Sequence, residues 1–270
     1  MHLKGLPFIK VTGGGNDFIL IDNRKGRVNI DDFPAIIPSI CERGLSVGAD
    51  GVILLTGAEN ADFNWAYFNS DGSEAPFCIN GILSTARTCQ LLGIKKNTVT
   101  FATPCGTIKT EIQKEKIRVF LPPPKDIRLN QELVIDDRSL NSNYVNTGVP
   151  HTVIFNESID NIPVVEMGKR IRNHKFFSPD GTNVDFVQVL NNTELNIRTY
   201  ERGVERETLS CGTGAFASAV VSTLLGLVSP SVRVNTQGGN YFMIDTSNNF
   251  LEGVARIIYV GELHEALWQK

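Results

Sequence analysis

Hydrophobic and polar positions along the chain predict a protein rich in β-strands. Apolar and polar residues alternate in FNWAYF at 63–68 and in LNIRTY at 195–200, which is typical of strands with one buried face. Four further segments are runs of β-branched, aliphatic or aromatic residues and also indicate strands: DGVILL, VDFVQVL, IRVFL and ARIIYVG.

Two segments predict helices instead, and each begins directly after a cysteine. INGILSTARTCQLLG follows Cys78, and GTGAFASAVVSTLLG follows Cys211. Both contain small residues near their start, continue in alanine and leucine, and stop at a glycine, Gly93 or Gly226. Because both segments are mostly apolar, we expect both helices to be buried.

The two cysteine segments belong to an internal duplication. Cys78 and Cys211 are 133 positions apart, and the same offset aligns many other residues without a gap. The aligned pairs are Gly15 and Gly148, Gly48 and Gly181, Tyr67 and Tyr200, Glu74 and Glu207, Gly81 and Gly214, Ala86 and Ala219, and the Leu-Leu-Gly runs at 91–93 and 224–226. The chain is therefore expected to contain two homologous halves.

The stretch LPPPKDIRLNQ between these halves carries three prolines, which cannot continue a strand or helix and indicate a boundary near 122–140. We therefore predict an N-terminal half over 1–130 that carries Cys78, and a C-terminal half over 131–270 that carries Cys211. The predicted class is α+β, with two pseudo-symmetric halves. Each half is a mostly antiparallel sheet wrapped around a central helix, and the active site is expected in the cleft between them.

Composition narrows the possible functions. Hydrophobic residues make up 41% and charged residues 20%, as in ordinary soluble globular proteins. The net charge of -3 and the absence of a basic run argue against a nucleic-acid partner. The N-terminus lacks the apolar core of a signal peptide and no apolar run has membrane-spanning length, so no membrane association is expected.

The cysteines indicate a reducing compartment, the cytoplasm. Their number is odd and their spacing irregular, which does not suit a disulfide framework, and without a CxxC pair a zinc site is not expected: Cys41, Cys78, Cys89, Cys105 and Cys211. A lone cysteine is usually a small buried apolar residue, and that interpretation is favoured for Cys41, Cys89 and Cys105.

The two repeated cysteines suggest a chemistry. A thiol at a helix N-terminus lies beside exposed N–H groups and the positive helix end, which would lower its pKa and could also receive a carboxylate. Two facing thiols resist simultaneous ionisation, so one thiolate and one thiol are expected. A base on one face of a carbon and an acid on the other would invert a stereocentre. Inherited packing cysteines are the alternative.

Several motifs are similar to those of one known family. In order along the chain they are GGNDFILID, FNSDGSEAPFCING, VPHTVIF, GTNVDFVQV and YERGVERETLSCGTGA, within about residues 8–262. The sequence resembles the diaminopimelate epimerases, which interconvert LL- and meso-diaminopimelate for lysine and cell-wall synthesis without pyridoxal phosphate. The resemblance implies an isomerase with no cofactor and no metal, a small-molecule amino acid substrate, and a possible homodimer.

The resemblance also implies roles for particular residues. Cys78 and Cys211 would be the two acid/base residues, with Glu201 and His151 as polar neighbours that assist the thiols. The backbone around Asn80 and Gly81, and around Gly212 and Thr213, would hold the reacting α-carboxylate. The distal end of the substrate would be read by Asn16, Asn69, Asn183 and Arg202.

Each of these assignments has a simpler alternative. Glu201 and Arg202 could form a surface ion pair, His151 could be a structural histidine, and Asn16 could occupy a left-handed turn. The chain also departs from the family pattern. Val149 replaces an asparagine that helps to recognise the distal amino acid group, Ile79 replaces a glycine after the first cysteine, Thr152 replaces a cysteine, and ILSTA replaces a Gly-Ala-Arg-Cys run.

Four functions are therefore considered. The leading one is diaminopimelate epimerase, and the departures at Val149 and Ile79 favour as its rival a racemase of the same fold that acts on another amino acid. A non-catalytic, two-lobed amino acid-binding protein is the third possibility. A cysteine hydrolase that uses Cys211 and His151 is the fourth, but it leaves the matching Cys78 unexplained.

Overall fold

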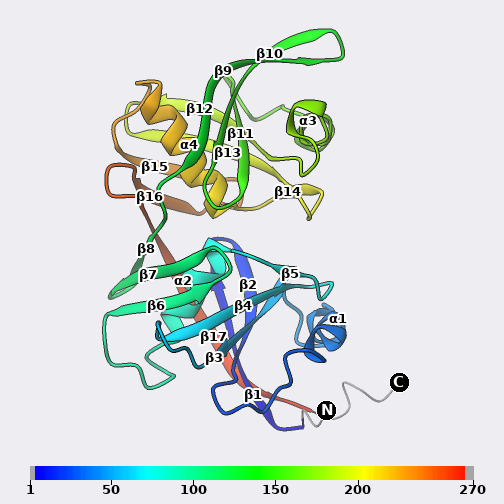
Figure 1. Ribbon diagram of the computed structural model, residues 1–270, viewed down its shortest axis with the longest axis vertical. Coiled ribbons are helices and arrows are strands. Elements are labelled where there is room, and N and C mark those ends of the chain that lie inside the picture. The colour runs from blue at the N-terminus through cyan, green and yellow to red at the C-terminus, as the bar shows by residue number, and fades with distance from the viewer. Residues whose placement is uncertain (1–3, 265–270) are drawn as a thin grey trace. The chain divides into compact units, whose positions relative to one another are not determined.

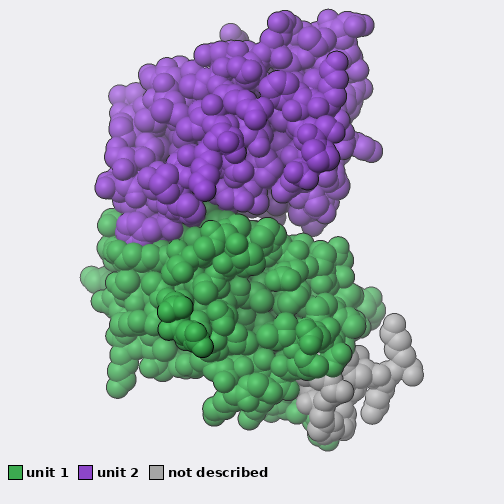
Figure 2. All heavy atoms as spheres, viewed as in Figure 1, with its two compact units in different colours: residues 1–119, 254–270 green, residues 120–253 purple. Residues whose placement is uncertain are grey.

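A computed structural model describes residues 4–264, and this part of the chain divides into two compact units. Described residues up to Val119 and from Val254 onward form unit 1, and Phe120–Gly253 forms unit 2 (Figure 2). This division differs from the predicted halves over 1–130 and 131–270, whose outer ends also lie outside the described residues. The predicted α+β class, with two strand-rich domains, is confirmed.

The strands far outnumber the helices in both units (Figure 1). Unit 1 contains β1 Leu6–Gly13, β2 Asn16–Asp22, β3 Gly51–Thr56, β4 Phe63–Asn69, β5 Glu74–Ala75, β6 Thr98–Thr103, β7 Gly106–Gln113 and β8 Lys116–Phe120, whose last residue begins unit 2, with a 3-10 turn at Phe33–Ile36 and the helices α1 Ile37–Cys41 and α2 Ile79–Thr88. Unit 2 contains β9 Lys125–Ile135, β10 Arg138–Asn146, β11 Pro150–Phe155, β12 Asn183–Asn191, β13 Glu194–Glu201, β14 Arg206–Thr208, β15 Ser231–Thr236 and β16 Tyr241–Asp245, with a 3-10 turn at Lys175–Phe177 and the helices α3 Val164–Arg172 and α4 Gly212–Leu224. The last strand, β17 Phe250–Leu263, belongs to both units.

In unit 1 the central strands β2 and β3 are covered on both faces. One set of side chains, Ile19, Ile21, Val52 and Leu54, packs in a core with the residues of α1. The alternate set is equally buried and faces the other side, where α2 packs: Phe18, Leu20, Ile53 and Leu55. Burial on both faces explains why these strands are continuous apolar runs in the sequence rather than alternating ones.

In unit 2 the helix α4 is enclosed by strands. It contacts six of them, namely β10, β11, β12, β13, β15 and β16, and every residue from Gly212 to Ser222 is buried. A helix that is apolar on all sides is stable when all of its faces are buried, and here the strands cover them. The predicted sheet wrapped around a central helix is therefore present in this unit.

The duplication seen in the sequence is also present in the backbone. Gly15 and Gly148 have φ values of 104° and 103°, and Gly48 and Gly181 have 70° and 71°. The pairing of strands repeats as well, because β2 and β3 are parallel, as are their counterparts β11 and β12, while most other pairs are antiparallel. The repeated glycines therefore mark turns that require a positive φ in both halves.

The last strand of each repeat pairs with the first strand of the other repeat. β9, at the end of the first repeat, forms a hairpin with β10 in unit 2. β17, at the end of the second repeat, pairs with β1 in unit 1 through eight residue pairs from Leu6 with Leu263 to Gly13 with Ala255. This exchange explains why the units are not contiguous halves, since local sequence patterns predict strands but not their partners.

The first predicted helix is shorter than expected. α2 ends at Thr88 rather than near Gly93, and the chain continues in turns in which the Ile94 N–H donates to the carbonyl of Cys89 over 3.0 Å. Gly93 has a φ of 83° and ends this turn region. None of the helices within 4–264 is both long and apolar enough to cross a membrane.

Enclosure of α4 predicts a large cost for removing its central aromatic ring. Phe216 is fully buried, so we expect Phe216→Ala to lower the free energy of unfolding by about 3–5 kcal/mol. Leu224→Ala is the control on the same helix; Leu224 is 53% exposed, and its loss should change stability by about 0.5 kcal/mol. Urea denaturation measures both, and equal losses would contradict the enclosed position of Phe216.

Candidate active site

Cys78 is the N-cap residue of α2. Its backbone is extended, with φ of -149° and ψ of 109°, and its Sγ accepts a hydrogen bond from the Gly81 N–H over 3.4 Å. The thiol is only partly buried. A sulfur atom that accepts a backbone N–H at the positive end of a helix is in a favourable position to carry negative charge.

Two predicted substrate-binding asparagines lie together near this helix end. The buried Asn80, in the first turn of α2, donates from Nδ2 to Oδ1 of Asn16 on β2 over 2.8 Å. Asn69, at the end of β4, holds a tight turn instead, because its Nδ2 donates to the Ser73 hydroxyl over 3.0 Å.

Cys211 is the N-cap residue of α4 and ends a chain of polar contacts. His151, fully buried on β11, donates from Nδ1 to the carboxylate of Asp185 over 2.7 Å, since a carboxylate can only accept. Its Nε2 lies 2.9 Å from the hydroxyl of Thr213, which lies 3.4 Å from the Cys211 sulfur. Because a hydroxyl both donates and accepts, Thr213 can connect the imidazole to the thiol.

Glu201 also contacts the thiol. It lies at the end of β13, accepts a hydrogen bond from Cys211, and accepts another from the Thr208 hydroxyl over 2.6 Å. Burial raises the pKa of Glu201, although both hydrogen bonds oppose this. The carboxyl group is therefore a place where a proton from Cys211 can be accepted.

The expectation that the helix end makes Cys211 easy to ionise is wrong. Burial raises the pKa of this thiol well above its ordinary value, and the nearby carboxylates of Glu201 and Asp185 raise it further. The hydrogen bond from Thr213 acts in the opposite direction but does not outweigh them. Cys211 is therefore a protonated thiol at neutral pH.

Asn183 and Arg202 lie together near the start of β12 and the end of β13. The Asn183 amide donates to the carbonyl of Pro150 over 2.8 Å and accepts from the backbone N–H of Arg202 over 2.9 Å. The Arg202 guanidinium donates to the Asp180 carbonyl over 3.2 Å. It also lines a cavity of about 460 Å³ within unit 2, together with Arg128, Tyr144 and other residues.

The predicted site residues thus form two groups, one in each unit. Unit 1 holds the thiol of Cys78, the backbone of Gly81, the paired amides of Asn16 and Asn80, and the turn at Asn69. Unit 2 holds Cys211, Gly212 and Thr213 at the start of α4, with His151, Glu201, Asn183 and Arg202 on strand ends or in the adjoining turns.

The structure adds residues that the sequence analysis missed. Asp185 is fully buried and orients His151, and its position in VDFVQV, as the one charge in an apolar strand, is a signal that could have revealed it. Thr208 on β14 supports Glu201. In unit 1, Asp50 accepts a hydrogen bond from Asn16 over 2.9 Å.

Comparison with known proteins identifies the family. The family model of diaminopimelate epimerase matches residues 8–124 and 143–258, which is most of the chain. The chain belongs to the diaminopimelate epimerase family. It is 40% identical over 278 residues to the diaminopimelate epimerase of Aquifex aeolicus, with 96% of this chain and 98% of the relative covered. The diaminopimelate epimerase of Archaeoglobus fulgidus is 38% identical and is covered over 87% of each chain.

Solved structures share the fold at much lower identity. A hydroxyproline epimerase from Agrobacterium vitis matches with a TM-score of 0.72 at 14% identity, over 95% of this chain and 90% of that one. A PhzF-family phenazine biosynthesis protein from Bacillus anthracis matches with a TM-score of 0.70 at 14% identity, over 96% and 99%. These neighbours share the fold, and membership of the diaminopimelate epimerase family identifies the chain as an isomerase.

The carboxylate of Asp185 leaves no room for a side chain at Gly214 on α4. A Cβ atom on Gly214 would lie 2.3 Å from Oδ1 of Asp185, so Gly214→Ala must displace the carboxylate that holds His151. Alanine ordinarily favours a helix over glycine by about 1 kcal/mol, yet we expect this family member to lose thermal stability and activity. Ser218→Ala on the same helix is the control and should preserve both. A more stable and fully active Gly214→Ala variant would contradict the proposed contact.

The raised pKa of Glu201 predicts a pH-dependent stability change. The pKa of Glu201 is higher in the folded than in the unfolded protein. The protonated carboxyl group therefore stabilises the fold fully below the ordinary carboxyl pKa. This stabilisation is lost as the pH rises through the raised pKa of the folded state. Glu201→Gln should therefore raise the melting temperature by about 2–4 °C at alkaline pH and by less at acid pH.

Glu205→Gln provides a control of opposite sign. Burial acts to raise the pKa of Glu205, but hydrogen bonds from Gly203, Arg172 and Tyr200 outweigh it and lower the pKa. Its stabilisation is present above the ordinary carboxyl pKa and is lost in acid, so Glu205→Gln should lower the melting temperature at neutral pH. Thermal melts of both variants across pH test the pair, and a Glu201→Gln variant that is less stable at every pH would contradict the assignment.

Proposed function

We propose that this protein is a diaminopimelate epimerase that interconverts the LL and meso forms by transferring protons between the α-carbon and the thiols of Cys78 and Cys211. The observation that carries the proposal is the placement of both cysteines as N-caps of equivalent helices in a chain that matches its named relatives over nearly its full length. The product would serve the synthesis of lysine and of peptidoglycan precursors.

The two thiols differ in a way that assigns their starting roles. Cys211 has a raised pKa and is the thiol, so it acts as the acid that delivers a proton to the α-carbon. Cys78 accepts the Gly81 N–H at the N-terminus of α2 and would be the thiolate that removes the α-proton. In one turnover the α C–H bond breaks as its proton moves to the Cys78 thiolate, and a new C–H bond forms on the opposite face with the proton from the S–H bond of Cys211. Cys78 is then the thiol and Cys211 the thiolate.

The reverse reaction requires Cys211 to lose its proton. Glu201 accepts a hydrogen bond from this thiol, and Thr213 connects the thiol to His151, whose other ring nitrogen is held by Asp185. Glu201 can take this proton and then donate it back in a hydrogen bond to the thiolate, and the Thr213 hydroxyl can also donate to the thiolate. His151 and Glu201 therefore serve as the polar neighbours of the acid/base pair.

The reacting carboxylate would be received by backbone N–H groups. The first turns of α2 and α4 supply them at Asn80 and Gly81, and at Gly212 and Thr213. Such donors at helix N-termini stabilise the negative charge that builds on the carboxylate as the α-proton leaves. No cofactor is needed for this role.

The distal end of the substrate would be read by Asn16, Asn69, Asn183 and Arg202. Arg202 suits a distal carboxylate, because guanidinium groups pair with carboxylates through two parallel hydrogen bonds. Val149 is the observation that favours a second candidate, a racemase for another amino acid, since a valine cannot replace the polar contact of the family asparagine.

We also propose that the protein is cytoplasmic and forms a homodimer.

Hydrogen exchange in deuterated water tests the reaction. Incubation with LL-diaminopimelate should give meso product that carries deuterium at the inverted carbon, while the remaining substrate stays largely unlabelled at early times, because one group removes the proton and a different group delivers one.

Cys78→Ser and Cys211→Ser should each nearly abolish the reaction, since a hydroxyl is a far poorer base. Mass spectrometry and chiral chromatography measure both effects.

The same assay separates the two candidate substrates. A panel of single amino acids is incubated in parallel with diaminopimelate. Deuterium at the α-carbon of another amino acid, but not of diaminopimelate, would refute the leading proposal and support the racemase. A Cys78→Ser variant that retains near-normal turnover in both directions would refute the two-base mechanism.

A further inference from the structure

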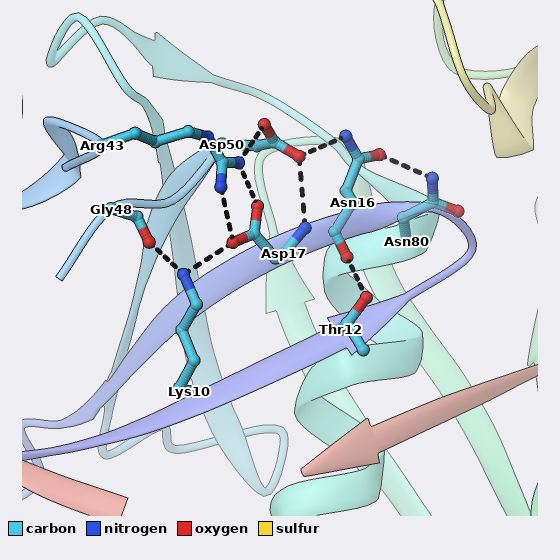
Figure 3. Close-up of polar contacts among 8 residues, drawn as sticks. All are labelled: Lys10, Thr12, Asn16, Asp17, Arg43, Gly48, Asp50 and Asn80. Carbon is cyan, nitrogen blue, oxygen red and sulfur yellow. Dashed lines mark hydrogen bonds and ion pairs between the residues drawn. The ribbon is translucent and has the colours of Figure 1, made fainter. Parts of the chain in front are cut away.

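A network of charged residues lies next to Asn16 in unit 1 and consists of Lys10, Asp17, Arg43 and Asp50 (Figure 3). The proposed reaction makes no direct use of this network. Lys10 is buried on β1 and pairs with Asp17 over 2.7 Å. Arg43 bridges two carboxylates, because its guanidinium lies 3.2 Å from Oδ2 of Asp17 and 2.9 Å from Oδ1 of Asp50. Of these residues, only Asp50 touches the side chain of Asn16.

Asp50 determines which way round the Asn16 amide lies. Its Oδ2 accepts from Nδ2 of Asn16 over 2.9 Å, and from the backbone N–H of Asp17 over 3.2 Å. A carboxylate oxygen can only accept, so the amide nitrogen of Asn16 must face it. The amide oxygen then faces the opposite way, where it accepts from Asn80 over 2.8 Å, as Figure 3 shows.

The position of Asp50 is itself fixed. It directly precedes β3, and its backbone N–H donates to the Asp17 carbonyl over 3.0 Å, where the parallel strands β2 and β3 meet. Arg43 holds the second carboxylate oxygen. Burial acts to raise the pKa of Asp17, but hydrogen bonds and charge from Arg43 and Lys10 outweigh it and lower the pKa. The network therefore presents a rigid acceptor to Asn16.

We propose that Asp50 is a positioning residue that locks the orientation of the Asn16 amide and so decides which polar atoms it offers to the distal end of the substrate. This inference rests on the proposed function, in which Asn16 reads that end. After its bonds to Asp50 and Asn80, the Asn16 amide still has one N–H and one oxygen lone pair to offer. An amino acid end group carries both an ammonium, which needs the acceptor, and a carboxylate, which needs the donor.

Loss of the acceptor should weaken substrate binding more than turnover. Without Asp50 the Asn16 amide can rotate by half a turn and present its donor and acceptor in exchanged positions. We expect Asp50→Ala to raise the KM for diaminopimelate about tenfold while kcat changes by less than about threefold, because a distal contact is made equally in the ground state and the transition state. An unchanged KM would overturn the proposal.

Asp50→Asn separates orientation from charge. The asparagine oxygen can still accept from Asn16 if its nitrogen faces Arg43, whose side chain is 59% exposed and can turn towards solvent. The KM should therefore stay within about threefold of the wild-type value. An Asp50→Asn variant as impaired as Asp50→Ala would show that the charge matters and would overturn the orienting role.

Two further variants distinguish positioning from general stability. Asp17→Asn makes the same chemical change in the same network without touching the Asn16 side chain, so it should lower the melting temperature but leave the KM unchanged. In an Asn16→Ala background, Asp50→Ala should cause no additional rise in KM, because its effect passes through Asn16. An additive rise would overturn the proposal.

A spectroscopic readout makes this inference independent of the proposed reaction. The Asn16 side-chain amide signal in a nitrogen-15 NMR spectrum can be assigned by its disappearance in Asn16→Ala. Its hydrogen exchange should be slow in the wild type and faster in Asp50→Ala. An unchanged exchange rate would overturn the positioning role even in an active enzyme, whereas a wild type without epimerase activity would overturn only the proposed function.

Discussion

The organisation of unit 2 depends on one buried carboxylate. Asp185 is fully enclosed, and a charge in this position is tolerated only when hydrogen-bond donors surround it. His151 and Thr199 donate to it over 2.7 and 2.8 Å, and the bare backbone of Gly214 leaves room for it beside α4. Asp185 orients His151, whose Nε2 lies beside the Thr213 hydroxyl. Burial raises the pKa of Cys211, and the carboxylates of Glu201 and Asp185 raise it further. The acid role proposed for Cys211 is thus a consequence of how the unit is packed.

Unit 1 places its cysteine in the same way but surrounds it differently. Cys78 also caps a helix, but its thiol is only partly buried, whereas the thiol of Cys211 is buried beside the carboxylates of Glu201 and Asp185. Unit 1 has a charged network next to Asn16 instead, in which Asp50 accepts from the Asn16 amide and is linked through Arg43 to Asp17 and Lys10. A duplicated backbone therefore carries two unlike environments, as a reaction that needs both a base and an acid requires.

Much of this could be predicted from the sequence, because it depends on local patterns. The strands at FNWAYF and LNIRTY, the helices that begin after Cys78 and Cys211, and the repeat at one offset all follow from the spacing of apolar residues and glycines. The pairing of β17 with β1 could not be predicted, since partners far apart in the chain leave no local signal. The raised pKa of Cys211 was also missed, because it depends on burial and on carboxylates from other strands.

We propose that the thiols of Cys78 and Cys211, each at a helix N-terminus, act on opposite faces of one α-carbon. A crystal structure of the Cys78→Ser, Cys211→Ser double variant with LL-diaminopimelate would test it most directly. We expect the two serine hydroxyls on opposite faces of the same α-carbon, and the carboxylate on the N–H groups at the start of α2 and α4. Both hydroxyls on one face, or a ligand that contacts only one helix end, would contradict it.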